Sequence, residues 1–74
     1  MGREIGLDVR GMEPPEPLER VLETIDSFVA GDVLKLVIDC QPHPLYRILD
    51  RNGFAFREKP GTESLYEISI WREG

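Results

Sequence analysis

The chain has 74 residues, 41% of them hydrophobic and 31% charged, which is ordinary for a globular protein and predicts one small domain over residues 1–74. Its net charge of −5 repels a phosphate backbone and makes nucleic acid an unfavourable partner. A single cysteine excludes an internal disulfide, and no apolar run approaches the ~20 residues of a membrane span, so we expect a cytoplasmic protein.

Alternation and periodicity predict six elements in the order βαβαββ. Leu7 and Val9 alternate with polar neighbours in the first strand, and residues 33–38 are nearly all apolar, as in a central strand. Alternation along this central strand predicts that Leu34, Leu36 and Ile38 face the helices and that Lys35 and Val37 point to the other face. The pair Asn52-Gly53 is typical of a helix end. The predicted strands are 4–10, 33–38, 54–59 and 65–71, the predicted helices are 15–29 and 44–52, and a hairpin loop over 60–64 joins the last two strands.

The first predicted helix has one apolar face, with apolar residues at intervals of three and four. These residues are Leu18, Val21, Leu22 and Ile25, followed by either Phe28 or Val29. Pro15 and Pro17 suit a first helical turn because they lack N–H groups that would be unpaired there. Gly31 suits a left-handed stop after the helix.

This element order predicts a two-layer α/β sandwich. Right-handed crossovers place both helices on one face of the sheet, the first two strands run parallel, and the last two pair as a hairpin. We therefore expect a four-stranded mixed sheet with one face left open.

A motif joins the first strand to the first helix: Leu7-Asp8-Val9-Arg10-Gly11-Met12-Glu13-Pro14-Pro15-Glu16-Pro17. It resembles the signature Leu-Asp-x-Arg-Gly-x-x-Cys-Pro-x-Pro of the TusA/SirA/YedF-like sulfur-carrier family. Pro14 stands where that family has its sulfur-carrying cysteine, so the chain looks like an uncharacterised, bacterial sister branch with Pro-Pro-Glu-Pro. The resemblance implies the same fold, and a sulfur relay cannot run through position 14 because proline has no nucleophile.

The two strand-to-helix loops are predicted to meet beyond the carboxyl ends of parallel strands, where ligands gather in such sheets. Each loop leads into a helix N-terminus, with its positive end and free N–H groups. Asp8 and Arg10 are predicted to form an ion pair that holds the turn at Gly11; alternatively, Arg10 binds an anionic ligand. The resulting ligand or partner rim comprises Asp8, Arg10, Glu13, Cys40 and His43, with Met12, Asp39 and Gln41 in the same loops.

Cys40 is the one thiol of the chain. It is either a relocated sulfur acceptor or a buried small hydrophobe, and His43 three residues on either lowers its pKa or simply begins a helix. Cys40-x-x-His43 supplies two ligands where zinc needs three or four, so neither a metal nor another cofactor is predicted.

The open sheet face is the second candidate surface. Val37, Leu65 and Trp71 are predicted to form an apolar patch there, which is typical of a partner or dimer interface. We expect a monomer or a weak homodimer.

The sequence therefore favours a small non-catalytic interaction or carrier-like domain, not an enzyme, that binds a protein partner or a small ligand. The alternative is a sulfur-transfer or redox role through Cys40. A further alternative, RNA binding, rests on fold analogy with the C-terminal domain of bacterial translation initiation factor 3, and the net charge opposes it.

Overall fold

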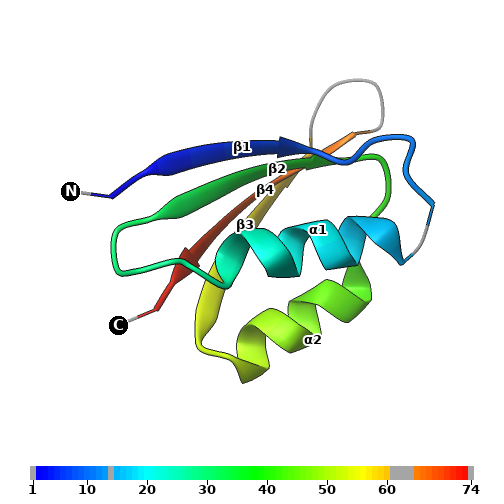
Figure 1. Cartoon of the computed structure of the whole chain (residues 1–74). Helices are drawn as coiled ribbons and strands as arrows, with labels where there is room; N and C mark the ends of the chain where they lie inside the picture. Colours follow the sequence, from blue (N-terminus) through cyan, green and yellow to red (C-terminus); the bar gives the residue numbers. More distant parts are fainter. Residues whose placement is uncertain (1, 14, 61–64, 74) are drawn as a thin grey trace.

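The computed structural model describes residues 2–13, 15–60 and 65–73. It confirms the order βαβαββ (Figure 1). The elements are β1 (Glu4–Asp8), α1 (Glu16–Ile25), β2 (Val33–Ile38), α2 (His43–Arg51), β3 (Phe54–Pro60) and β4 (Tyr66–Arg72). The predicted hairpin loop lies outside the described residues except for Pro60, which ends β3.

The four strands form one mixed sheet in the order β1-β2-β4-β3. β1 and β2 are parallel, whereas β4 is antiparallel to both of its neighbours, β2 and β3. Both helices cover the same face of this sheet, and the other face has no helix over it (Figure 1). The two-layer sandwich predicted from the crossovers is therefore confirmed.

The core lies between the sheet and the two helices. Leu34, Leu36 and Ile38 of β2 are buried, whereas Lys35 between them is exposed on the other face, as the alternation predicts. The helices contribute buried apolar residues to the same core: Val21 and Ile25 of α1, and Leu45 and Leu49 of α2.

The end of α1 differs from the prediction, because the helix stops at Ile25 and not at residue 29. The amide of Phe28 donates to the carbonyl of Ile25 at 3.0 Å, a tighter turn that buries Phe28 and leaves Val29 62% exposed. Of the two alternatives, Phe28 is thus the core residue. Gly31 has φ 97° but belongs to the connection to β2, several residues past the helix end.

A buried carboxylate, which the sequence did not indicate, holds this connection. Asp32 is 1% exposed and accepts hydrogen bonds from the amide of Val29 (3.1 Å), the amide of Arg3 (3.0 Å) and the guanidinium of Arg3 (2.8 Å). The Arg3 side chain, helped by the two amides, holds the pKa of Asp32 far below its usual range.

β1 ends at Asp8, two residues earlier than predicted. Val9 still donates its amide to the carbonyl of Val37 at 3.0 Å and is completely buried, so the chain follows the sheet for one further residue before it turns. None of the helices within the described ranges is long and apolar enough to cross a membrane.

Candidate functional site

The two strand-to-helix turns meet at the carboxyl ends of β1 and β2. The carboxylate of Asp39, just after β2, accepts a hydrogen bond from the amide of Gly11, just after β1, at 2.9 Å. Gly11 has φ 79°, a left-handed conformation that residues with a side chain rarely adopt. The topology thus brings the two predicted halves of the rim together.

Asp8 and Arg10 form the predicted ion pair. Arg10 donates from Nε to Asp8 Oδ1 at 2.9 Å and from Nη2 to Asp8 Oδ2 at 2.6 Å, and its amide also donates to Oδ1 at 3.1 Å. These bonds, led by those from the Arg10 side chain, lower the pKa of Asp8 to about 2. Both side chains are about half exposed, so the pair shapes the turn at its surface.

The expectation of free N–H groups at the helix starts is wrong for α2. Pro42 is its N-cap residue, and Pro44 has no N–H. The amide of His43 donates to the carbonyl of Gln41 at 3.1 Å, and those of Leu45 and Tyr46 donate to the carbonyl of Pro42 at 3.0 and 3.3 Å. Consequently, the first turn of α2 offers no free backbone donor to an anion.

The start of α1 is similar. Its N-cap is Pro15, and Pro17 lacks an N–H. The amide of Glu16 donates to the carbonyl of Glu13 at 3.0 Å, and that of Glu19 to the carbonyl of Pro15 at 3.1 Å. This leaves at most the amide of Leu18 in the first turn, so anion binding by paired helix starts has little support.

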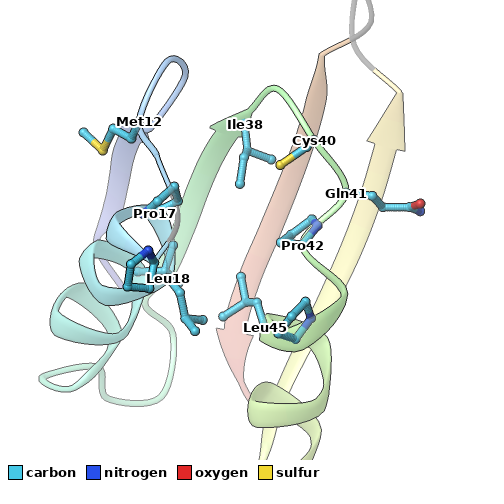
Figure 2. A pocket seen from close by; sticks show the side chains of 11 residues that line it. Met12, Pro17, Leu18, Ile38, Cys40, Gln41, Pro42 and Leu45 are labelled. Carbon is cyan, nitrogen blue, oxygen red and sulfur yellow. The ribbon is translucent and has the colours of Figure 1, made fainter.

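An apolar pocket of about 270 Å³, which the sequence pattern did not predict, lies between these two helix starts (Figure 2). Figure 2 shows the sulfur of Cys40 turned toward the pocket and the amide of Gln41 turned away from it. The residues that line it come from both turns and both helices: Met12, Pro15, Pro17, Leu18, Val21, Ile38, Cys40, Gln41, Pro42, Pro44 and Leu45.

Glu58 of β3 holds the β2–α2 turn, which forms one wall of the pocket. Its carboxylate accepts hydrogen bonds from Gln41 Nε2 at 2.8 and 2.9 Å and from the hydroxyl of Tyr46. The Tyr46 ring is stacked on Phe56, with ring centres 4.4 Å apart and planes at 3°. This group, Gln41, Tyr46, Phe56 and Glu58, is called the Glu58 cluster below, and it joins the β2–α2 turn to β3.

Contacts within the Glu58 cluster change the pKa of its two acidic groups, the carboxyl of Glu58 and the hydroxyl of Tyr46. The hydroxyl of Tyr46 and then the amide of Gln41 lower the pKa of Glu58, whereas burial and the neighbouring carboxylate raise the pKa of Tyr46 well above its usual value. Nothing in the sequence indicated that Glu58 has its partners in the β2–α2 turn and in α2.

The predicted rim residues are thus only partly brought together. Cys40 is exposed at the pocket, so the prediction of a buried cysteine is wrong. His43 packs its ring edge-on against Tyr46, with centres 6.1 Å apart, and does not line the pocket. Glu13 is exposed in the turn before α1, and Pro14 lies outside the described residues.

Within the described part of the chain, no three His, Cys, Asp or Glu side chains are grouped so that they could hold a metal ion. On the open sheet face, Val37 and Trp71 lie on strands β2 and β4 and are half-buried, as is Leu65 directly before β4. The predicted patch residues are therefore accessible to a partner.

Comparison with solved structures supports the fold. A SirA-like protein from Desulfitobacterium hafniense superposes with a TM-score of 0.81 over 95% of this chain and 99% of that chain, at 19% sequence identity. At this identity the likeness concerns the fold alone. No curated protein matches the sequence.

A family model matches residues 6–72, which include the strand-to-helix motif, both walls of the pocket and the whole of the final strand. The family is described as "Uncharacterized conserved protein (DUF2249)". The chain therefore belongs to the DUF2249 family and has the SirA-like fold.

Proposed function

We propose that this domain is a non-catalytic binding module whose apolar pocket receives an uncharged, apolar side chain of a protein partner. The pocket between the starts of α1 and α2 is the observation on which the proposal rests. Non-catalytic binding fits the position of His43, whose ring packs against Tyr46 and does not line the pocket that Cys40 lines.

The chemistry of the pocket favours an apolar occupant. Aliphatic, proline and sulfur-containing side chains make up nearly all of its lining, and the one polar side chain, Gln41, is held by Glu58. A charged group placed there would lose its hydration and gain at most one backbone donor, the amide of Leu18, because the other amides of the helix starts are absent or already bonded. An apolar group would be stabilised by the removal of its surface from water.

The size of the pocket favours a side chain over a larger ligand. Pockets for drug-sized molecules measure roughly 300–1,000 Å³. The pocket here, about 270 Å³, is just below that range and suits one or two side chains. A few residues that enter well-packed pockets of the partner contribute most of the binding energy at protein interfaces.

The proposal can be tested with side-chain mimics and backbone NMR. N-acetyl-leucinamide and N-acetyl-phenylalaninamide are titrated into the ¹⁵N-labelled domain, and N-acetyl-aspartate is the charged control. We expect saturable shifts at Met12, Leu18, Cys40 and Leu45 with the two apolar probes and none with the aspartate. Shifts scattered over the surface, or equal shifts with all three probes, would contradict the proposal.

Two substitutions at one position separate pocket occupancy from thiol chemistry. Cys40 is exposed at the mouth of the pocket, so Cys40→Phe should fill it without disturbing the core and should abolish the probe shifts. Cys40→Ser, which leaves the pocket open, should retain them.

The second candidate function is sulfur transfer or redox chemistry through Cys40. It is favoured by the exposure of the thiol and its orientation toward the pocket (Figure 2). A reducing compartment such as the cytoplasm would keep such a thiol available. Mass spectrometry of protein treated with a persulfide donor tests this candidate: an added sulfur on the wild type that is absent from Cys40→Ser supports it, and an unmodified wild type removes it.

A further inference from the structure

The sheet face without helices separates its charges by strand. β1 at one edge presents Glu4 and Asp8 on this face, whereas β3 at the other edge presents Arg57 and Lys59. The two inner strands place Val33 and Trp71 side by side between them. All four of these charged residues are exposed.

Over the whole face, the positive and negative residues of the strands are equal in number. On this face the inner strands carry the charged residues Lys35 and Glu67, so the four strands place three cations and three carboxylates there, and the Asp8 carboxylate is also bonded by Arg10. A face of this kind does not select a uniformly acidic or basic partner, since each would be attracted by one edge and repelled by the other. Its two oppositely charged edges are complementary to each other.

We propose that this face binds the same face of a second copy of the chain, related by a two-fold axis that runs parallel to the strands between β2 and β4. The axis exchanges the two edges, so β1 of one protomer lies over β3 of its partner. In the strand register, Asp8 then faces the partner's Lys59, and Trp71 faces the partner's Val33.

The register also argues against the other symmetric arrangement. A two-fold axis perpendicular to the strands would place each strand over its own copy, with Lys35 over itself and Arg57 over itself, because both lie in the middle row of the face. Like charges at contact distance destabilise an interface. In the favoured arrangement Arg57 lies over the partner's Gly6, and the space above Gly6 is open, since a Cβ added there would meet no atom within 4 Å. A long side chain therefore has room at this position.

The area of the face predicts a weak dimer. Four strands about 4.8 Å apart and up to seven residues long span about 19 by 24 Å, so the pair buries about 900 Å² in total. This is below the roughly 1,200–2,000 Å² of stable interfaces. We therefore expect association that depends on concentration and becomes evident between micromolar and millimolar protein.

Charge reversal with sedimentation equilibrium tests the proposal. The wild type should approach the mass of a dimer as its concentration rises. Asp8→Lys and the double variant R57E/K59E should each weaken self-association by about tenfold or more, because residue 8 then faces a like charge at the partner's residue 59 at both pairs of edges. An equimolar mixture of the two variants should associate again, since opposite charges then meet at both.

Matched controls on the helix side of the molecule change the total charge equally. Glu23 lies on α1, and Arg47 and Arg51 are exposed on α2. Glu23→Lys and R47E/R51E should therefore leave the wild-type association unchanged. Amide NMR spectra establish that every variant is folded.

Three results would overturn the proposal. One is a wild type that remains monomeric at millimolar concentration. Another is equal association of the wild type and both reversal variants, which would place the interface elsewhere. The third is a mixture that stays monomeric, which would show that the oppositely charged edges do not meet.

Discussion

The two strand-to-helix turns lie side by side at one edge of the sheet, but different kinds of contact hold them. The β1–α1 turn depends on exposed groups: the Asp8–Arg10 ion pair and the bond from Gly11 to Asp39. The β2–α2 turn is joined to β3 by the Glu58 cluster, in which aromatic stacking accompanies the hydrogen bonds. Exposed ion pairs contribute little to stability, whereas partly buried polar groups with packed neighbours contribute more.

This difference predicts that the α2 wall of the pocket is rigid and that the α1 wall adapts to an occupant. Leu45 on the α2 side is 1% exposed, whereas Leu18 on the α1 side is only partly buried. A partner side chain that enters the pocket would then move α1 and its turn more than α2. The difference can be examined by removing one contact at a time.

The largest effect is expected from Leu45→Ala. Removing a fully buried leucine leaves a cavity and costs about 2–5 kcal/mol of unfolding free energy. Leu18→Ala, the matched substitution on the other wall, should cost about 1–2 kcal/mol because part of its surface is already in water. Urea unfolding measures both values. Equal losses would show that the two walls are equally well packed and would contradict the comparison.

A smaller effect is expected from Tyr46→Phe. This substitution retains the stacking on Phe56 but removes the hydroxyl that donates to Glu58, and should cost about 1 kcal/mol in urea unfolding. Amide hydrogen exchange should become faster in the β2–α2 turn and stay unchanged in the β1–α1 turn. A uniform change in both turns would show that they open together.

Glu58→Gln is the control for charge. The glutamine keeps the shape and an acceptor oxygen, so it should retain part of the hydrogen bonding. The unfolding free energy of Glu58→Gln should therefore lie between those of the wild type and Tyr46→Phe. The pKa of Glu58 is lowered in the folded protein, so its contribution is present above its ordinary pKa and is lost as the pH falls below that value. As the pH falls below the ordinary pKa of glutamate, the unfolding free energy of Glu58→Gln should therefore decrease less than that of the wild type.

Local pattern was enough to predict the layers of the fold. The alternation over 33–38 located the buried face of β2, and the periodicity of 18–25 located the buried face of α1, since both depend on neighbours along the chain. The same pattern could not choose between Phe28 and Val29. The turn that decides between them is stabilised by Asp32, whose main partner, Arg3, is 29 positions away.

The candidate site was predicted less completely for the same reason. The ion pair of Asp8 and Arg10 joins residues two apart, so the sequence contained it. The bonds from Gln41 and Tyr46 to Glu58 join residues 17 and 12 apart, and the pocket depends on the gap between two helices. Side chains distant in sequence carry no local signal of their meeting, although the topology correctly placed the two turns at one edge.

The smallest effect, and the most direct measure of the exposed turn, concerns the titration of Asp8. Its pKa is about 2 because Arg10 stabilises the carboxylate, whereas an unfolded aspartate titrates near ~3.9. The stabilisation is thus fully present above pH ~4 and disappears as the pH falls toward 2. Carboxyl-carbon NMR should show this low pKa in the wild type and a higher pKa in Arg10→Gln, which loses the side-chain bonds to Asp8 but keeps the bond from the amide of residue 10. Because both groups are half exposed, the same substitution should hardly change the unfolding free energy at neutral pH. A large loss of stability in Arg10→Gln would mean that the β1–α1 turn is held as firmly as its neighbour, and would contradict the inference that the α1 wall adapts.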